Sequence, residues 1–391
     1  RLLARRDDAV RSLVAAVARH ALRGAMAPET CAALVRLVSA VAAAGATAGG
    51  SKESVRAARH REDLASAMAD CSDAVPCWIM PTYRVSSCLP ATLASFDLVV
   101  LDEASQSDVA ALPALLRGQR VLVVGDQKQV SPTSAFVSEA AVRDLKRSLL
   151  ASGHPFVEQV LPGRSVFDLA QTCFADARCA LSHHFRCVPQ CIAFSNAQFY
   201  HDRLMPRRLP PRSQRLTPAL VDVKVPGGKK KGKTNEAEAA AVVAYLAAQL
   251  APGGELARRG ASVCVISLLG VEQARSIRRR ALEALTAAQL ARVVVVVGDP
   301  ASLQGDERDV VLLSLVASPK EAPAQVGRLY EQRFNVALSR ARDRVVLFRS
   351  LELKDVPNAD DLKHRTLAFF QRAASARPPR AAPRRAPSDA A

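Results

Sequence analysis

Two hydrophobic runs near residue 100 each end in polar side chains that suit phosphate chemistry. Leu98–Leu101 leads into the adjacent carboxylates Asp102 and Glu103, and Val121–Val124 leads into the segment GDQKQ, which carries Gln129. Buried parallel strands that deliver polar groups at their carboxyl ends are typical of the ligand edge of an open α/β sheet. Adjacent Asp and Glu at such an edge suit nucleotide hydrolysis, because one carboxylate can hold Mg²⁺ while the other orients or deprotonates a water.

Alternating strand and helix patterns must position these groups. Residues 1–70 are Ala-rich with apolar spacings of three and four, which predicts helical structure that GATAGG (45–50) divides into two pieces. Strands are predicted at 77–80, 98–101, 121–124, 219–225, 262–269, 292–297, 309–316 and 343–350. Helices are predicted at 134–151, 235–250, 271–285 and 330–341, and residues 181–200 predict a strand end, a turn at Pro189 and a further helix. The pattern is that of an α/β protein with parallel sheets.

Bulk composition narrows the choice of partners. The chain has 391 residues, enough for two or three domains, and 49% are hydrophobic but only 4% aromatic, which predicts aliphatic cores. The net charge of +17, from 54 Lys and Arg against 37 Asp and Glu, favours a polyanionic partner, with nucleic acid the first candidate. A compositional bias towards Arg and Ala is an alternative source of that charge.

Membrane and redox signals point to an intracellular protein. No segment has eighteen uninterrupted apolar residues, so no membrane span and no membrane partner is expected. The nine cysteines are scattered and form no CxxC pair, which indicates reduced thiols rather than a zinc site or a disulfide framework. We therefore expect a location in the nucleus or cytoplasm.

Six segments, in this order, resemble the motifs of superfamily 1 helicases, most of all the branch that includes the nonsense-mediated-decay RNA helicase. They are DEASQ (102–106), GDQKQVSP (125–132), HHFRCVPQ (183–190), ISLLGVEQA (266–274), LQGDERDVVLLSLV (303–316) and RFNVALSRARDRVVLF (333–348). The resemblance covers about residues 76–350 and implies two RecA-like α/β domains of the P-loop NTPase fold, with a nucleotide cleft between them. Residues 1–75 would be a helical segment, 76–180 an incomplete first domain, 181–352 the second domain, and 353–391 a basic, partly disordered tail.

The resemblance also implies roles for individual residues towards ATP and Mg²⁺. Asp102 would coordinate Mg²⁺, Glu103 would activate the attacking water, and Gln129 would sense the γ-phosphate. Arg186 and Arg340 would be arginine fingers offered from the second domain, because a planar guanidinium can grip the transferring phosphoryl group. Gln304, Gly305 and Glu307 match a motif that touches ribose and nucleic acid and so joins the two sites.

The phosphate-binding loop GxxxxGK[ST] that this family needs is not found before DEASQ. The one literal match, Gly227–Thr234, lies after the HHFRCVPQ motif that carries Arg186. It precedes a predicted helix that begins at Asn235. We interpret it as an exposed lysine loop that could touch a nucleic-acid backbone, with a true phosphate loop as the alternative. We expect the chain to belong to a longer protein and, on its own, to bind and hydrolyse ATP poorly.

The sequence therefore predicts an ATP-dependent helicase or translocase that acts on single-stranded DNA or RNA. One alternative is a catalytically dead helicase-like protein that only binds nucleic acid. Another is a P-loop enzyme of a different class, built around Lys233.

Overall fold

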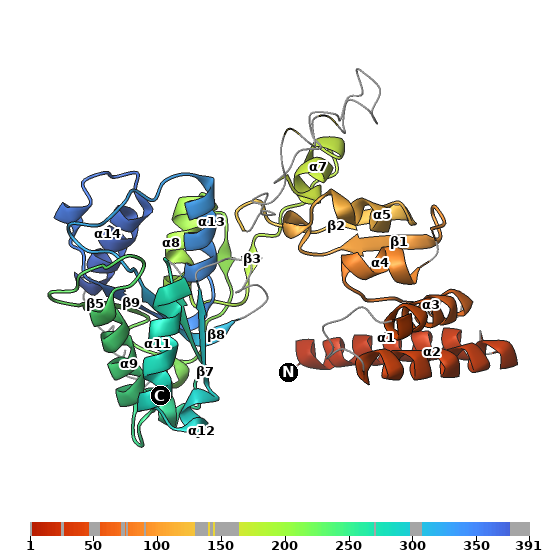
Figure 1. The fold of residues 1–391 in the computed structure, drawn as a ribbon, viewed down its shortest axis with the longest axis horizontal. Coiled ribbons are helices and arrows are strands. Elements are labelled where there is room, and N and C mark those ends of the chain that lie inside the picture. The colour runs from red at the N-terminus through yellow and green to blue at the C-terminus, as the bar shows by residue number, and fades with distance from the viewer. Residues whose placement is uncertain are drawn as a thin grey trace, which may run out of the picture. The chain divides into compact units, whose positions relative to one another are not determined.

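The computed structural model describes residues 2–24, 27–46, 55–71, 75, 77–89, 91–129, 140, 144, 164–269, 271–297 and 307–375. The chain forms two compact units, each described here by itself: residues 1–125 with 131–175, and residues 126–130 with 176–391. Figure 1 draws most of the first unit in red to orange and most of the second in green to blue. None of the helices in the described ranges is long and apolar enough to cross a membrane.

The first unit begins with three helices, α1 (Leu2–Gly24), α2 (Pro28–Ala46) and α3 (Val55–Asp70). Two helical pieces were predicted, so the break before Pro28 was missed. Proline is favoured in the first turn of a helix, because a backbone N–H at that position would have no acceptor within the helix. Helices α2 and α3 pack together, and a small core forms where Leu64 and Met68 of α3 meet Cys88 of α4 (Thr82–Cys88).

The predicted strand at 77–80 is wrong. These residues belong to no strand that the structure describes, and Ile79 is 95% exposed. Prolines at 76 and 81 bracket the segment, and a proline cannot donate to a strand ladder. The apolar residues between them therefore resemble a strand in composition only.

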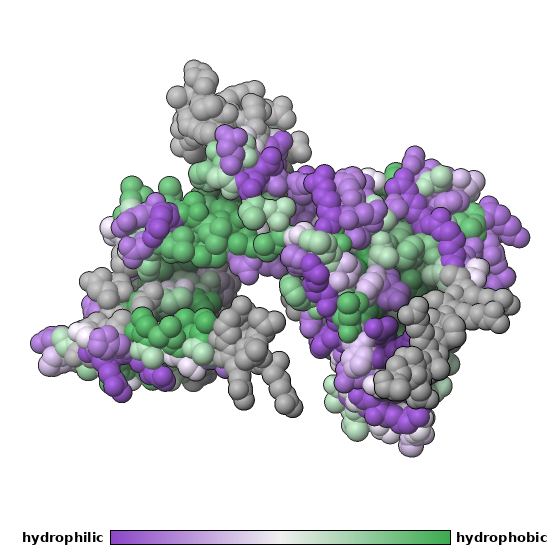
Figure 2. Space-filling view, turned by 180° about the vertical axis from the view of Figure 1, so that it is seen from behind, coloured by the Kyte–Doolittle hydropathy of each residue, from purple (hydrophilic) through white to green (hydrophobic). Residues whose placement is uncertain are grey.

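A two-stranded parallel sheet of β1 (Phe96–Leu101) and β2 (Gly118–Val123) carries the first predicted motifs. Short helices η1 (Ala104–Gln106), η2 (Val109–Ala111) and α5 (Leu112–Leu115) connect the two strands, and α7 (Val166–Cys173) packs near η1. The core here is small, made of Leu101, Ala104, Ala111 and Val166. The face in Figure 2 shows much hydrophobic surface over this unit, and the predicted helix at 134–151 lies almost entirely outside the described residues.

The second unit is built on a five-stranded, all-parallel sheet in the order β5-β9-β8-β6-β7. Its strands are β5 (Leu220–Lys224), β6 (Val263–Ser267), β7 (Val293–Val297), β8 (Arg308–Ser314) and β9 (Ala341–Arg349), and a two-stranded sheet joins β3 (His183–His184) to β4 (Met205–Pro206). Its helices are α8 (Pro189–Phe199), α9 (Glu236–Leu250), α10 (Glu255–Arg258), α11 (Val271–Ala284), α12 (Ala287–Leu290), α13 (Arg328–Leu338) and α14 (Leu362–Ser375), with the short turns η4 (Arg212–Gln214) and η6 (Leu353–Asp355). All strands and long helices predicted between 219 and 350 are confirmed.

Both faces of this sheet are covered by helices, as Figure 1 shows. Alternate residues of β8 face opposite sides: Val311 packs in one core with α8, α13 and α14, and Leu312 packs in the other with α9 and α11. A strand buried on both faces can be apolar throughout, which explains the continuous aliphatic runs of its sequence. Helix α14 belongs to the first of these cores through Leu367 and Phe370, where the sequence analysis expected a tail.

Candidate functional site

The acidic pair lies on a tight turn at the carboxyl end of β1. The Glu103 backbone is left-handed, with φ of 52° and ψ of 35°, and its N–H donates to Asp102 Oδ1 at 2.9 Å. Beyond the turn, the Ala104 N–H donates to the Val124 carbonyl at 2.8 Å, so the turn is fastened to the end of β2. A non-glycine residue held at positive φ is strained, and such residues cluster at functional sites. Both carboxylates are exposed at the sheet edge where a ligand would approach.

Gly125, the glycine of GDQKQ, lies where no side chain fits. A Cβ atom at this position would be 2.7 Å from the Phe167 ring of α7 and 3.0 Å from the Ser105 nitrogen. Glycine is therefore required for the close approach of the β2 end to the turn after Glu103. The neighbouring Ser105 hydroxyl is buried and has no hydrogen-bond partner among the described residues.

The residues at this edge fit a Mg²⁺ ion of the kind that nucleotides bring. Mg²⁺ is usually bound by one or two protein carboxylates, with waters and substrate phosphates completing its shell. Asp102 is an exposed carboxylate with one oxygen engaged by the Glu103 N–H. The described residues contain no group of three or more His, Cys, Asp or Glu side chains that could hold a metal by themselves. A single carboxylate sharing the ion with phosphate is consistent with that finding.

The loop Asp126–Gln129 belongs to the second unit, and the Asp126 carboxylate organises it. Asp126 accepts hydrogen bonds from the Lys128 N–H (2.9 Å), from Gln129 Nε2 (3.0 Å) and from the Tyr200 hydroxyl (2.6 Å). Burial, followed by the Asp126 charge, raises the pKa of Tyr200, so its hydroxyl remains a donor throughout the physiological range. The carboxylate thus fixes both the backbone of the loop and the side chain of Gln129.

Two amide side chains of α13 hold the same loop. Asn335 Nδ2 donates to the Lys128 carbonyl (2.9 Å) and to the Tyr200 hydroxyl (2.8 Å), and Gln332 Nε2 reaches the Gln127 carbonyl (3.4 Å). Sequence reasoning missed Tyr200, Gln332 and Asn335. The signal available in the sequence was a pair of amide side chains three residues apart on a predicted helix. In the structure Gln332 and Asn335 are 4% and 1% exposed, which is unusual for amides.

Arg340 and Gln129, both predicted site residues, are brought together. Arg340 is 3% exposed, and its NH2 group donates to Gln129 Oε1 at 3.3 Å while its Nε donates to the Val336 carbonyl at 3.2 Å. Because Asp126 takes the amide nitrogen of Gln129, the amide oxygen is left to face the guanidinium. The contact orients a buried cation with a neutral partner, so its positive charge is not cancelled by this bond.

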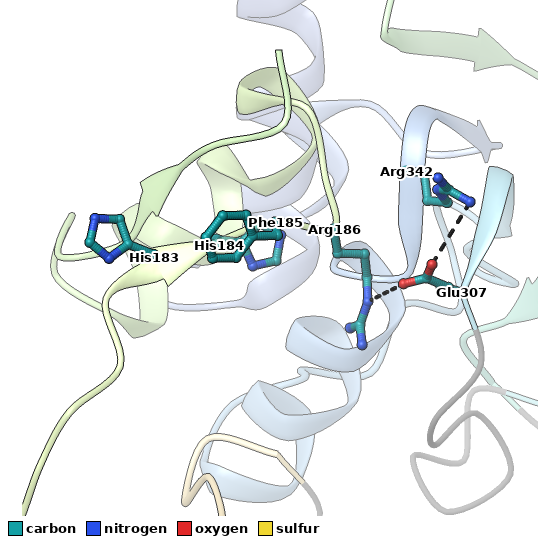
Figure 3. Close-up of a pocket in the computed structure, with 6 residues that line it drawn as sticks. All are labelled: His183, His184, Phe185, Arg186, Glu307 and Arg342. Atoms are coloured by element: carbon teal, nitrogen blue, oxygen red, sulfur yellow. Dashed lines mark hydrogen bonds and ion pairs between the residues drawn. The ribbon is translucent and has the colours of Figure 1, made fainter. Parts of the chain in front are cut away.

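Arg186 lies in a second cluster, shown in Figure 3, where it and Arg342 both point toward Glu307. Arg186 Nε lies 2.9 Å from Glu307 Oε2, and Arg342 NH1 lies 3.9 Å from Glu307 Oε1. These three residues line a hollow of about 480 Å³ with His183, His184 and Phe185. The predicted residues Gln304 and Gly305, which precede Glu307 in the sequence, lie outside the described residues.

A neutral histidine, His184, fixes the backbone on either side of Arg186. The Cys187 N–H donates to His184 Nε2 at 3.0 Å, which requires that nitrogen to be unprotonated. Burial and then the nearby Arg186 lower the pKa of His184, and both favour that neutral form. Burial raises the pKa of Cys187 to about 12, while Arg186 and Arg340 both act to lower it. Because burial raises its pKa, the Cys187 thiol holds little of the nucleophilic thiolate form at neutral pH.

Two families, each described as an AAA domain, match residues 163–351 and 82–135. The chain is 27% identical over 296 residues to the "Uncharacterized ATP-dependent helicase MG140 homolog" of Mycoplasma pneumoniae, and 27% identical over 289 residues to the "Uncharacterized ATP-dependent helicase MG140" of Mycoplasma genitalium. These alignments cover 72% and 70% of the chain but 25% of each relative, so the chain spans a quarter of the length of these curated relatives.

Solved structures that resemble the chain include two viral helicases. The PRRSV helicase is 16% identical, with 64% of this chain and 34% of that one covered and a TM-score of 0.28. The complex of Arterivirus nonstructural protein 10, a helicase, with DNA is 15% identical, with 73% and 52% covered and a TM-score of 0.33.

The parallel α/β sheets and the matched families together define the class as an α/β protein of the RecA-like, P-loop NTPase fold. Within that class, the matched families and the curated relatives support a superfamily 1 helicase-like protein, as the motifs predicted.

Proposed function

We propose that this chain is the motor region of an ATP-dependent helicase or translocase whose ATP hydrolysis is stimulated by single-stranded DNA or RNA. The observation that carries the proposal is the contact between Gln129 and Arg340, 3.3 Å apart and braced by Asp126 and Asn335. Both residues were expected at the γ-phosphate. Through this contact, the motifs GDQKQVSP and RFNVALSRARDRVVLF meet in the second unit.

Each predicted residue has a task in hydrolysis that its surroundings support. Glu103 would accept a proton from the attacking water, whose oxygen would form the new bond to the γ-phosphorus as the bond to ADP breaks. Asp102 would hold Mg²⁺, which when bound supplies positive charge to the phosphate oxygens. Arg340 would stabilise the charge on the transferring phosphoryl group, and Gln129 keeps its guanidinium oriented for that contact.

Arg186 would act on the same phosphates from the HHFRC turn. Arg186 is paired with Glu307, and the hydrogen bond to His184 holds the turn in place. Glu307 has Arg342 as a second cation within 3.9 Å, so it keeps a partner when Arg186 turns to a phosphate.

Steady-state ATP hydrolysis by the full-length protein, with and without single-stranded DNA and RNA, tests the proposal. We expect Glu103→Gln and Arg340→Ala each to lower the stimulated rate by about 100-fold or more, because each removes a group that acts in the transition state. Asp97→Asn, which changes an exposed carboxylate at the opposite end of β1, is the matched control and keeps the rate.

Two outcomes would count against the motor. A Glu103→Gln protein that hydrolyses ATP at the unmodified rate would contradict the assignment of that carboxylate and of the site. Nucleic-acid binding by a folded full-length protein with no hydrolysis at all would instead favour the alternative of a catalytically dead, nucleic-acid-binding helicase-like protein.

A further inference from the structure

A second polar feature of the second unit, the segment Gly227–Thr234 between β5 and α9, takes no part in the site above. We call it the lysine loop. It holds four lysines in five positions, Lys229, Lys230, Lys231 and Lys233, and contains no acidic residue. The first, third and fourth of these are exposed, and none of the four makes an ion pair within the described part of the chain. Such a concentration of like charge raises the local positive potential, which attracts anionic ligands.

Acidic groups around the loop are already engaged by other cations. Glu236 is paired with Arg280 (2.8 Å), and Glu352 lies 2.5 Å from Lys224. Asp361 holds Lys363, whose pKa is lowered by burial and also by the charge of Lys230. The lysine loop therefore keeps its positive charge available on the surface.

The loop is also rigid. Lys231 and Thr234 exchange backbone hydrogen bonds of 2.8 and 3.1 Å, and Gly227 and Gly232 adopt φ of 67° and 61°, which L-residues rarely adopt. At its base, Gly228 lies against the Ser350 side chain so closely that a Cβ atom would clash. A loop held in one conformation loses little entropy when it binds, so its lysines are preorganised.

A buried polar network beneath the loop fixes its base to the sheet. Glu238 of α9 is 0% exposed and accepts hydrogen bonds from the Ser314 hydroxyl (2.8 Å), the Val316 N–H (2.8 Å) and the Ser350 N–H (3.0 Å). These donors lie at or just after the carboxyl ends of β8 and β9. The lysine loop follows β5, so it stands at the same, carboxyl edge of the sheet, where open α/β proteins bind ligands.

The geometry does not suit a nucleotide phosphate loop, although the sequence matches one. In such a loop the backbone N–H groups at the start of the helix cradle the phosphates. Here Asn235 caps α9 by accepting from the Glu238 N–H (3.2 Å), and its own N–H donates to Gln273 Oε1 (2.8 Å). Asn235 is 0% exposed, and the Thr234 hydroxyl donates to the Lys231 carbonyl (3.1 Å). The helix start is thus closed by side chains, and only the lysine heads face outward.

We propose that the lysine loop grips the sugar-phosphate backbone of the nucleic-acid strand on the second unit, rather than the phosphates of a nucleotide. The inference rests on the proposed function, since it supplies that motor with a contact for its track. Lysines bind phosphate as point charges and carry no base-specific pattern, so the contact serves any sequence and both DNA and RNA.

Fluorescence anisotropy with labelled 20-mers of dT and of U tests the loop in the full chain. The variant Lys229→Gln, Lys231→Gln, Lys233→Gln removes three exposed charges. The matched control Arg212→Gln, Arg258→Gln, Arg279→Gln removes three exposed charges elsewhere on the second unit. We expect the lysine variant alone to lose about tenfold or more in affinity for both oligonucleotides, and the slope of log K against log salt to flatten by about 2, since each phosphate contact on a single strand contributes about 0.7.

Three results would overturn the proposal, and they are distinguishable. Equal losses in the lysine variant and its control would mean that only overall charge matters. A lysine variant that keeps oligonucleotide affinity but loses binding of a fluorescent ATP analogue would identify a nucleotide phosphate loop. Both results leave the proposed motor function intact, whereas a folded, unmodified chain that binds neither oligonucleotide would remove the motor's track and the loop's ligand together. Thermal unfolding of each variant confirms that the exposed substitutions leave the fold in place.

Discussion

In the second unit the polar side chains of the candidate site are enclosed, whereas in the first unit they stand at an open edge. Arg340 and Asn335 are 3% and 1% exposed and belong to a hydrogen-bonded set, while Asp102 and Glu103 are exposed on a single strained turn. The difference teaches that the two halves of the chemistry are positioned by different means. Packing and buried hydrogen bonds preorganise the arginine side, whereas a strained backbone turn presents the exposed carboxylates.

The sheets differ in the same direction. Val310–Leu313 of β8 is 0% exposed on both faces, whereas Leu98 and Leu122 of β1 and β2 are 50% and 51% exposed. The apolar strands of the first unit are therefore only partly covered by the described residues. We expect the second unit to be the more stable of the two, and the predictions below test that comparison from its largest consequence to its smallest.

The largest effect should come from equal truncations in the two sheets. Leu312→Ala opens a cavity in a closed core and should destabilise the second unit by about 2–5 kcal/mol, whereas Leu122→Ala, half exposed, should cost about 1 kcal/mol or less. Urea unfolding followed by hydrogen exchange of amides in β8 and in β2 separates the two units, since a chain of two units need not unfold in one step. Equal costs at the two positions would contradict the comparison.

The buried Glu238 should make the second unit sensitive to pH. Burial raises the pKa of Glu238 to about 7, from 4.5 for an ordinary glutamate. Between these values the folded state holds more protons than the unfolded state, so its stabilising contribution is complete below pH 4.5 and is lost as the pH rises through about 7. At 1.36 kcal/mol per pKa unit, the loss is roughly 3 kcal/mol.

Chemical denaturation of the second unit from pH 4.5 to 8, with Glu238→Gln and Glu236→Gln beside the unmodified chain, measures this dependence. Glu238→Gln should abolish it. Glu236, two residues away on the surface of α9, has its pKa lowered by Arg280, so its contribution has the opposite sign and is lost only as the pH falls. A stability that does not change between pH 5 and 7 in the unmodified chain would show that Glu238 is charged throughout.

Much of this fold follows from the sequence, because strands buried on both faces leave continuous aliphatic runs. The runs at 263–267 and 308–314 are of this kind, whereas the two that end at the DEASQ and GDQKQ motifs are aliphatic but lie on strands that are only partly buried. The failures are local conflicts. Residues 77–80 have the apolar composition of a strand but lie between two prolines, and α14 was hidden beside a basic, proline-rich tail.

The candidate site was predictable in its motifs and not in its bonds. The resemblance placed Gln129 and Arg340 at one phosphate, and the two lie 3.3 Å apart. The supporting residues Tyr200, Gln332 and Asn335 were missed because their partners lie 74 to 207 positions away, and no local pattern records such contacts. The roles of Asp102, Glu103, Arg186 and the other site residues stay predictions.

Loss of one hydroxyl should distinguish an enclosed network from an exposed contact. Tyr200→Phe removes a 2.6 Å hydrogen bond to the Asp126 carboxylate and should cost about 1–3 kcal/mol, because bonds to charged groups are strong and the carboxylate is left short of a donor. In the first unit, Gln106→Ala removes a 3.5 Å contact with Glu103 and should cost a few tenths of a kcal/mol. Thermal unfolding and hydrogen exchange of the Lys128 amide measure the two losses. If Tyr200→Phe left the free energy of unfolding unchanged, the tyrosine hydroxyl would not be needed to hold the loop, and the contacts from α13 would suffice.

The smallest effect should come from the ion pair that joins α2 to α3 in the first unit. Arg36 lies 3.0 Å from Asp70, but their side chains are 58% and 48% exposed, so water and salt screen the attraction. Arg36→Ala should therefore cost less than about 1 kcal/mol of unfolding free energy, and even that cost should vanish at 1 M salt.

In the second unit the pair of Arg349 with Asp222, at 2.7 Å and with side chains 7% and 10% exposed, gives the opposite case. Asp222→Asn leaves the buried Arg349 with Glu352, 3.7 Å away, as its remaining carboxylate among the described residues, and should cost about 3–5 kcal/mol at any salt concentration. A cost of Arg36→Ala that does not change with salt would contradict this contrast between the two units.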